Sequence, residues 1–239
     1  FILFVGDLPL WTREGFLEAY ADDVFVTVEA DTEAELRAKL EEEGGNILRY
    51  FASNHLVANA SKTAMIVFRS KGNQEPFSIK LEGETITEAD EEKLLGVYIQ
   101  GDLKWTKHIE KVTTDINYGI STLRRLRHHL DRKDLSIIAD GLVMAKLRYC
   151  LPVFAAESIR FQASDAQSGQ LQRIQRCQNN MLCTLTGSRS RDHVRVSDML
   201  TGTGFLSVNQ SASYLLVMEM WKARQFDVPY LSTVLDRRR

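Results

Sequence analysis

The spacing of apolar and polar residues divides the chain into a first part of short alternating segments and a second part with helical periodicity. An apolar run at residues 1–5 predicts a buried strand. Two short runs rich in Val, Phe and Tyr, at residues 17–20 and 24–28, predict the arms of a hairpin. Two adjacent aspartates, Asp22 and Asp23, lie at the predicted tip of this hairpin.

A helix is predicted to follow the hairpin. Thr32 begins a capping-box pattern, and apolar residues then recur at mostly helical spacing as far as Phe51. The stretch EEEGG at residues 41–45 predicts a break or a frayed turn midway along this helix. A strand is predicted at residues 64–68, and short strands joined by glycine turns are predicted across residues 77–105. This order predicts an α+β arrangement in which the helix covers one face of a sheet.

The second part of the chain is predicted to be all-helical. Apolar residues recur at intervals of three and four from Ile109 to Leu130, which predicts one long amphipathic helix. Further helices are predicted from capping residues and glycine, and they run from a cap at Asp134 to Leu147, over residues 171–185 closed by Gly187, and from a Ser207–Gln210 capping box to about Arg224.

Length and composition set the size of the core. With 239 residues and 44% hydrophobic content, the chain can bury one sizeable core or two modest ones. The formal net charge of −2 argues neither for nor against a nucleic-acid partner. Its distribution is more informative, because residues 14–43 contain eleven acids and two bases, whereas residues 104–148 contain ten bases and five acids. This asymmetry indicates two working regions.

The cysteines and the apolar runs bear on the compartment. Cys150, Cys177 and Cys183 lack disulfide spacing, which favours an intracellular location in the nucleus or cytoplasm over secretion. A zinc site made from Cys177, Cys183 and His193 is disfavoured, because it needs a fourth ligand and closer pairing. No apolar run approaches the roughly eighteen residues of a membrane span, and the first run lacks the basic leader of a signal peptide. Because the chain begins at Phe1 within a predicted strand, we expect it to be cut from a longer protein.

The paired aspartates are the first candidate for chemistry. Two carboxylates so close together repel each other, and a bound cation relieves that repulsion. Mg²⁺ prefers oxygen ligands and commonly completes its shell with substrate phosphates, so the tip could serve phosphoryl transfer. The plain alternative is that Asp is a favoured turn residue and needs no function here.

Five segments around the aspartates resemble landmarks of reverse transcriptases, in the form found in non-LTR retrotransposons. Tyr20-Ala21-Asp22-Asp23 matches the Phe/Tyr-x-Asp-Asp box of that family. The other similar segments follow in the family's order, the third with one residue fewer before its Leu-x-Trp, and they are FILFVGDLP (1–9), LVANASKT (56–63), LLGVYIQGDLKWTKHI (94–109), LRYCLPVF (147–154) and LQRIQRCQNNMLCTLTG (171–187).

The resemblance covers roughly residues 1–225 and implies a fold and an activity. The fold would be a partial polymerase palm, with the YADD hairpin in an antiparallel sheet and a packed helix, followed by an all-helical thumb-like region. The implied divisions are residues 1–105 for the later half of the palm, 106–155 for the thumb-like helices and 156–239 for a further helical region, with 156–168 as a linker or exposed loop.

The implied activity is RNA-directed DNA polymerase. The resemblance implies Mg²⁺ or Mn²⁺ as cofactor, and an RNA template, a DNA primer and deoxynucleoside triphosphates as partners, with no membrane. Family members hold two metals with a further aspartate on an earlier strand, which this sequence lacks. The missing fingers and first half of the palm, from the same polyprotein, are therefore implied as a partner, and we expect the isolated chain to be inactive.

The resemblance also assigns catalytic roles to individual residues. Asp22 would bind the metal, with Asp23 as a supporting neighbour. Lys62 would lie near the leaving pyrophosphate and neutralise its charge. The alternative for Lys62 is a solvated lysine at a helix end. Asn59 and Thr63 are predicted to hold the turn rather than touch substrate.

Nucleic-acid contacts are implied for the palm and for the long helix. Gly96 belongs to the hairpin that would support the primer end, and Trp105 is predicted either to stack near nucleic acid or, the favoured reading, to be buried as an anchor. His108 is predicted to make a polar contact. The bases of the long helix could track phosphates without sequence preference, or could simply form a solvated face. The implied contact residues are Tyr20, Gly96, Lys107, Lys111, Arg124, Arg125 and Arg127, with a weaker second patch at Arg173, Arg176, Arg189, Arg191 and Arg195.

Three functions therefore remain open at this point. The first is a palm and thumb portion of a reverse transcriptase. The second is a degenerate or co-opted domain that binds nucleic acid or protein without catalysis. The third is an unrelated α+β metal-dependent phosphotransferase, which would explain the aspartates but not the other landmarks.

Overall fold

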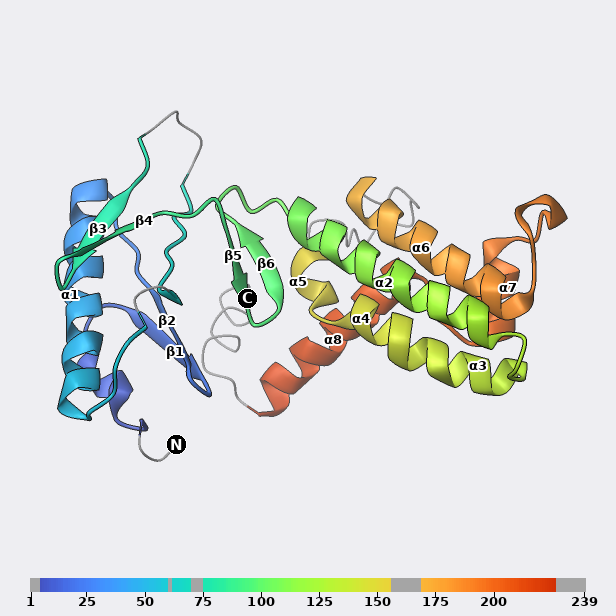
Figure 1. Cartoon of the computed structure of the whole chain (residues 1–239), viewed down its shortest axis with the longest axis horizontal. Coiled ribbons are helices and arrows are strands. Elements are labelled where there is room, and N and C mark those ends of the chain that lie inside the picture. The colour runs from blue at the N-terminus through green and yellow to red at the C-terminus, as the bar shows by residue number, and fades with distance from the viewer. Residues whose placement is uncertain (1–4, 60–61, 70–74, 156–168, 227–239) are drawn as a thin grey trace. The chain divides into compact units, whose positions relative to one another are not determined.

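The computed structural model describes residues 5–59, 62–69, 75–155 and 169–226 (Figure 1). Among these residues the strands form three separate two-stranded sheets, and helices make up most of the rest, which confirms the α+β class. The chain divides into two compact units, which we call the first unit (residues 1–94 and 99–103) and the helical unit (residues 95–98 and 104–239). The strand predicted at 1–5 lies almost wholly outside the described residues, and the linker predicted at 156–168 lies entirely outside them.

The first unit combines one long helix with short strands. Its predicted hairpin is confirmed, because β1 and β2 pair antiparallel in the register Phe16 opposite Thr27 and Tyr20 opposite Asp23. The elements of this unit are a 3-10 helix at Leu8–Trp11, β1 at Phe16–Tyr20, β2 at Asp23–Thr27, α1 at Glu33–Ser53, β3 at Ser78–Leu81, β4 at Glu84–Thr87 and β5 at Glu91–Leu94.

Helix α1 begins where the sequence predicts and does not break where it predicts. The Thr32 hydroxyl accepts a hydrogen bond from the Glu35 N–H at 3.2 Å. The helix then continues through residues 41–45, so the predicted break is wrong. The reason is close packing, since a Cβ at Gly44 would lie 2.7 Å from Cδ2 of Leu81 on β3. A glycine that lets two elements meet compensates for its helix penalty of about 1 kcal/mol.

The strand predicted at residues 64–68 is also wrong. Within the described residues this segment is extended but belongs to no ladder. One backbone bond holds it, from the Ala89 N–H to the Met65 carbonyl oxygen at 2.8 Å. Its apolar side chains line a pocket over α1, so burial accounts for the strand-like pattern without sheet pairing.

The helical unit is built around α2, and the predicted long helix is confirmed over Thr106–Leu126. Its apolar stripe, which includes Ile109, Ile116 and Leu123, is almost completely buried against the other helices. The remaining elements of this unit are α3 at Arg132–Ala139, a π-helical turn at Asp140–Met144, α4 at Ala145–Arg148, α5 at Leu151–Ala155, α6 at Gly169–Thr186, a 3-10 turn at Ser190–Asp192, α7 at Val196–Thr203 and α8 at Val208–Gln225, while β6 at Val97–Gln100 begins in this unit and ends in the first.

The helix ends test the predicted caps. Asp131, and not Asp134, caps α3, because its side chain accepts the Asp134 N–H at 2.8 Å. The predicted cap was one turn too late, since both aspartates precede the same apolar run. The end of α6 at Gly187, which has a φ of 74°, is confirmed. The Ser207–Gln210 capping box of α8 is confirmed in both directions, with bonds of 3.3 and 2.9 Å.

We expect Gly119 in α2 to resist substitution even though alanine favours helices. A Cβ at this position would lie 3.0 Å from Cγ2 of Val143 and 3.1 Å from the Leu142 carbonyl oxygen. Gly119→Ala should therefore lower the free energy of unfolding by about 1–3 kcal/mol, measured by urea denaturation. The matched control is Gly141→Ala, where a Cβ meets nothing within 4 Å, and it should be neutral or stabilising by up to about 1 kcal/mol. Equal effects of the two substitutions would contradict this packing.

Candidate active site

The aspartates lie at the tip of the β1–β2 hairpin. Tyr20 and Asp23 form the closing pair, so Ala21 and Asp22 make a two-residue turn. Ala21 has a φ of 54°, in the left-handed region that glycine adopts far more readily than alanine. The chain therefore accepts local backbone strain at the residue directly before Asp22.

Both carboxylates face solvent. Asp22 and Asp23 are exposed, and Tyr20 has 66% of its surface accessible. Val24 and Val26, by contrast, pack against the small core of Leu8, Ile47 and Tyr50. Alternation along β2 therefore fixes one face of the hairpin on α1 and leaves the acidic tip open to a ligand.

The acidic tip does not by itself make a complete metal site. Among the described residues no group of three or more His, Cys, Asp or Glu side chains is placed to hold a metal ion. This also applies to the zinc combination of Cys177, Cys183 and His193. The Cys177 side chain is buried, Cys150 and Cys183 are half-buried, and all three are free thiols. A divalent ion at Asp22 and Asp23 would need further ligands from water, substrate or other residues.

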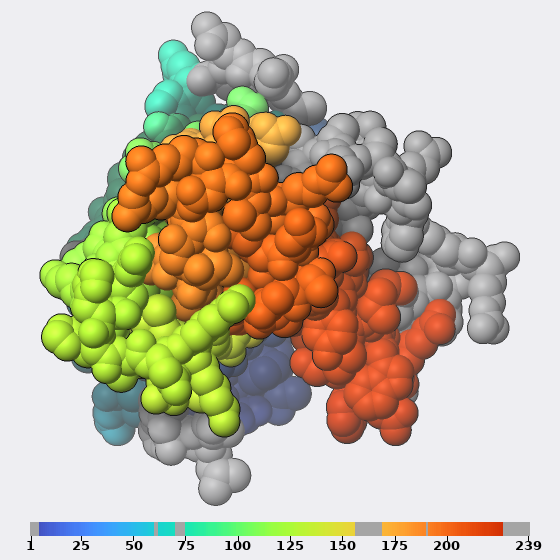
Figure 2. Space-filling view, turned by 90° about the vertical axis from the view of Figure 1, so that its right-hand side faces the viewer, coloured from blue at the N-terminus to red at the C-terminus, as the bar shows by residue number. Residues whose placement is uncertain are grey.

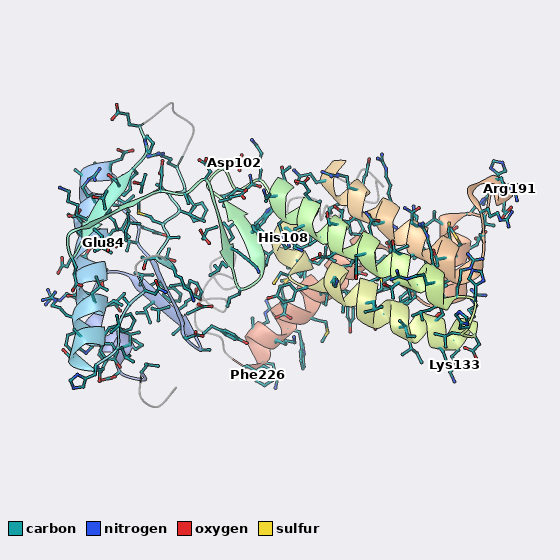
Figure 3. The ribbon with its side chains drawn as sticks, in the orientation of Figure 1. Glu84, Asp102, His108, Lys133, Arg191 and Phe226 are labelled. Atoms are coloured by element: carbon teal, nitrogen blue, oxygen red, sulfur yellow. The ribbon has the colours of Figure 1, made fainter. Side chains whose placement is uncertain are left out.

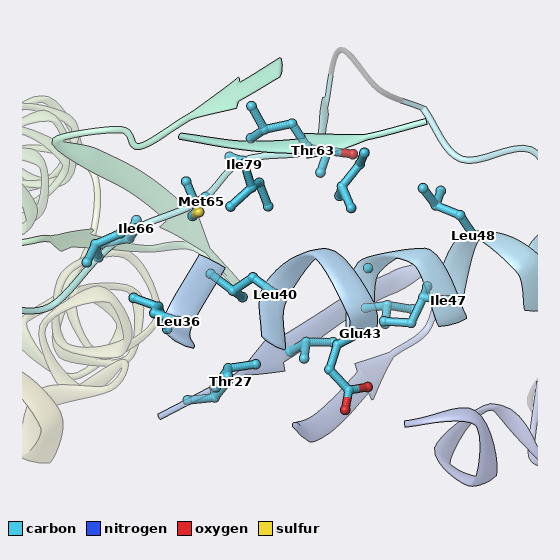
Figure 4. A pocket seen from close by; sticks show the side chains of 18 of the residues that line it. Thr27, Leu36, Leu40, Glu43, Ile47, Leu48, Thr63, Met65, Ile66 and Ile79 are labelled. Carbon is cyan, nitrogen blue, oxygen red and sulfur yellow. The ribbon is translucent and has the colours of Figure 1, made fainter. Parts of the chain in front are cut away.

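Glu43 of α1 anchors the strand that leads to the acidic tip. One carboxylate oxygen, Oε1, accepts hydrogen bonds from three consecutive backbone N–H groups: those of Arg13 at 2.9 Å, Glu14 at 2.6 Å and Gly15 at 3.1 Å. The side chain is 2% exposed and extends from α1 on the side of the hairpin strands (Figure 4). A Cβ at Gly15 would lie 2.7 Å from Cγ1 of Val26, so the anchored backbone also packs directly on β2.

The charge on Glu43 is stabilised by these contacts. Burial alone would raise the pKa of the Glu43 carboxyl, but the N–H groups of Glu14, Arg13 and Gly15, with the Asn46 side chain, outweigh it and hold the pKa below its ordinary value. The other oxygen, Oε2, is buried without a hydrogen-bond partner among the described residues. Sequence reasoning missed Glu43, although an acid in the helical register of Leu36, Leu40 and Ile47 was the available signal.

A second polar contact fixes the 3-10 helix before the hairpin. The Tyr50 hydroxyl, on α1, donates to Oδ1 of Asp7 at 2.6 Å. This hydrogen bond, together with burial and the charge of Asp7, raises the pKa of Tyr50 to about 12. Trp11 and Phe51 pack edge-on against the Tyr50 ring, with centroids 5.6 and 6.1 Å away. Tyr50 is therefore a supporting side chain and not a reactive one.

Lys62 lies in the turn after α1. Its backbone N–H donates to the Asn59 carbonyl oxygen at 2.9 Å, and the Thr63 hydroxyl donates to the same oxygen at 3.3 Å. Asn59 and Thr63 thus hold the turn, as predicted. The Lys62 side chain is exposed, and within the described part of the chain no ion pair or hydrogen bond joins it to Asp22 or Asp23. Its catalytic role stays a prediction.

The main pocket of the first unit is apolar. It has a volume of about 600 Å³ between α1, β2, the β3–β4 hairpin and residues 63–68. Leu36 and Leu40 lie on one side, with Met65 and Ile79 opposite (Figure 4). Thr63 and Glu43 are among its few polar lining residues, so its lining offers packing rather than acid–base chemistry.

The tip of the β5–β6 hairpin is fixed within the helical unit. Leu95 and Gly96, with φ values of 45° and 87°, form its turn. The Tyr149 hydroxyl donates to the Leu95 carbonyl oxygen at 2.5 Å, and a Cβ at Gly96 would lie 3.5 Å from the Tyr149 ring. The predicted contact of Gly96 with a primer is untested, but the residue does permit the tight turn and the close approach of Tyr149.

His108 is buried rather than an exposed polar contact. Its Nδ1 accepts the Tyr98 N–H at 3.4 Å, and its ring packs edge-on against Phe154 with centroids 4.9 Å apart. Because Nδ1 is an acceptor, the neutral ring carries its proton on Nε2, which has no partner among the described residues. Burial lowers the pKa of His108, which favours this neutral form. Trp105, one turn earlier, is half-buried against the same core, in line with its prediction as an anchor.

The predicted nucleic-acid contacts on α2 lie in two separate groups. Lys107 and Lys111 are exposed near its start, and Lys111 pairs with Asp115 at 2.7 Å. Arg124 and Arg125 lie in the last turn and are exposed, as is the following Arg127. About 20 Å of helix without another lysine or arginine separates Lys111 from Arg124. The predicted basic face is therefore two clusters and not one stripe.

Comparison with known proteins adds no relative. No protein-family model, no curated protein and no solved structure matches this chain. Within the described residues, no helix is both long enough and apolar enough to cross a bilayer.

We expect Glu43→Gln to loosen the start of β1 in a pH-dependent way. The folded pKa is lowered, so the charge of Glu43 contributes its full stability above the ordinary pKa of 4.5 and loses it as the pH falls through the folded value. At pH 7 the substitution should make the amides of residues 13–15 exchange with deuterium about tenfold to a hundredfold faster, equivalent to about 1.4–2.7 kcal/mol.

The matched control is Glu42→Gln, which alters an exposed ion pair with Arg13 at 3.2 Å. It should change exchange at residues 13–15 less than about threefold. The difference between wild type and Glu43→Gln should shrink on acidification below the folded pKa. A difference that stays constant with pH would show that the charge of Glu43 is not what holds the loop.

Proposed function

We propose that this chain is the later palm and the thumb of an RNA-directed DNA polymerase of the non-LTR retrotransposon type. The observation that carries the proposal is the hairpin: the YADD box occupies a two-residue turn that exposes both carboxylates while its opposite face packs on α1. The order of the other four landmarks along the sequence supports the same assignment. A generic acidic turn would explain neither the order nor the left-handed residue before Asp22.

In this proposal Asp22 is the metal ligand and Asp23 its supporting neighbour. The reaction is attack of a primer 3′-hydroxyl on the α-phosphorus of a deoxynucleoside triphosphate, directed by an RNA template, with release of pyrophosphate. Mg²⁺, or Mn²⁺, would polarise the phosphate oxygens and lower the cost of the charge that develops. Lys62 would offset charge on the leaving pyrophosphate.

The chain alone is proposed to be inactive. Two-metal catalysis needs ions about 3.5–4 Å apart between attacking and leaving oxygens, and two adjacent carboxylates on one turn supply only part of that clamp. We propose that the fingers and the first half of the palm, from the same polyprotein, supply the remaining ligands and the nucleotide pocket. The setting would be intracellular, in the nucleus or cytoplasm.

The test is primer extension on an RNA template by a longer polypeptide that joins the upstream coding sequence to these residues. Asp22→Ala should reduce extension by about a hundredfold to a thousandfold, because it removes charge stabilisation at the reacting phosphate. The matched control is Glu18→Ala, which removes an exposed acid from the same hairpin and should leave extension within about twofold. Extension that survives Asp22→Ala would rule out the assigned metal ligand.

A non-catalytic nucleic-acid-binding role is the second candidate. It is favoured by the absence, within the described residues, of a third acidic ligand near Asp22 and Asp23. The same longer polypeptide separates the two. If it binds primer–template but does not extend it with either Mg²⁺ or Mn²⁺, the co-opted or degenerate role is supported.

A further inference from the structure

The far end of the helical unit gathers cations from two segments that are distant in sequence. One segment is the end of α2 with the turn into α3, residues 124–134, and the other joins α6 to α7, residues 187–198. Arg132 of the first segment donates a hydrogen bond to the Gly202 carbonyl oxygen of α7 at 3.1 Å, which holds the two together. Lys133 and Arg191 lie at this same end in Figure 3, and Figure 2 shows α3 and the region of α7 adjoining on it.

We call this surface the basic end. The two segments contain eight lysine and arginine residues and four aspartates, together with three histidines. Among the described residues none of these lysines or arginines forms an ion pair within the chain. The exposed cationic side chains of the basic end are Arg124, Arg125, Arg127, Arg132, Lys133, Arg189, Arg191 and Arg195, and the histidines are His128, His129 and His193.

The four aspartates offset this positive charge only in part. Asp131 caps α3 and Asp134 lies in its first turn, where both face backbone N–H groups. Asp192 accepts the Arg189 N–H at 2.6 Å, and Asp198 lies in the first turn of α7. Acids at helix starts interact favourably with the local dipole, so their charge is already engaged. The arginines are left as the open groups of this surface.

We propose that the basic end binds the phosphate backbone of nucleic acid, as a site of its own within the helical unit. Seven of its eight lysine and arginine residues are arginines, whose planar guanidinium groups pair with phosphate oxygens through two parallel hydrogen bonds. The two segments contain no Phe, Tyr or Trp, so stacking on bases is not available. Binding is therefore through phosphates, independent of sequence and sensitive to salt.

This site differs from the contacts implied at the start of α2. Lys107 and Lys111 lie about 20 Å or more from Arg124 along the helix axis. A nucleic acid held at the basic end need not be the one held near Lys107. The inference does not rest on the polymerase proposal, because it requires neither Asp22 nor Lys62.

The experiment measures binding of the full 239-residue chain to a fluorescent RNA duplex of about 20 base pairs by anisotropy, over a range of salt concentrations. The test variant is Arg127→Glu, Lys133→Glu and Arg191→Glu combined. Its affinity should fall about tenfold to a hundredfold near 0.1 M salt, and the slope of log affinity against log salt should become shallower by about 2–3. Two duplexes of unrelated sequence should bind equally.

The matched control reverses three exposed cations elsewhere in the helical unit: Lys146→Glu, Arg176→Glu and Arg224→Glu. It has the same net charge as the test variant, and its affinity should stay within about threefold of wild type. Equal loss in both variants would overturn the proposal, because it would show a general charge effect.

Two further measurements protect the test. If the glutamate variant melts earlier than wild type, the milder set Arg127→Gln, Lys133→Gln and Arg191→Gln replaces it, with glutamine at the three control positions. Polyglutamate is added as a competitor at equal charge. If it displaces the RNA as well as unlabelled RNA does, the surface recognises acidic chains in general and the nucleic-acid assignment is wrong.

Discussion

The carboxylate of Glu43 is the contact on which the first unit depends. One oxygen of a nearly buried side chain accepts three consecutive backbone N–H groups and so fixes the chain as it enters β1. Those N–H groups would otherwise lie partly buried without partners, each at a cost of about 1–3 kcal/mol. The register of the hairpin, and with it the position of the acidic tip, follows from an anchor on α1 about twenty residues further along the chain.

The helical unit relies on a different constraint, which is the burial of one apolar stripe of α2. Ile109, Ile116 and Leu123 lie almost fully inside a core shared with the following helices. Because that stripe faces inward, the charged residues of α2 are restricted to its outer surface and its two ends. At the C-terminal end, cations also interact favourably with the helix dipole, which gives Arg124 and Arg125 a structural reason to be there as well as a binding one.

The candidate site could be predicted from the sequence only as far as it is local. The hairpin, its two-residue turn and the exposure of Asp22 and Asp23 follow from strand propensity and turn chemistry over about a dozen residues. Glu43 could not be assigned a role, because its partners at residues 13–15 are about thirty positions away and no periodicity encodes them. The meeting of the two segments of the basic end is of the same kind, since the Arg132–Gly202 bond joins residues seventy positions apart.

The sequence by itself determined the helices with strong apolar periodicity, the caps at Thr32 and Ser207, and the hairpin, because each is specified by neighbours within a few residues. The tertiary structure decided the features that compete with local preference. Helix α1 continues through two glycines because Gly44 packs on Leu81, and residues 64–68 stay unpaired although their pattern is that of a strand. In both cases the free energy comes from burial against distant segments, which local propensity does not contain.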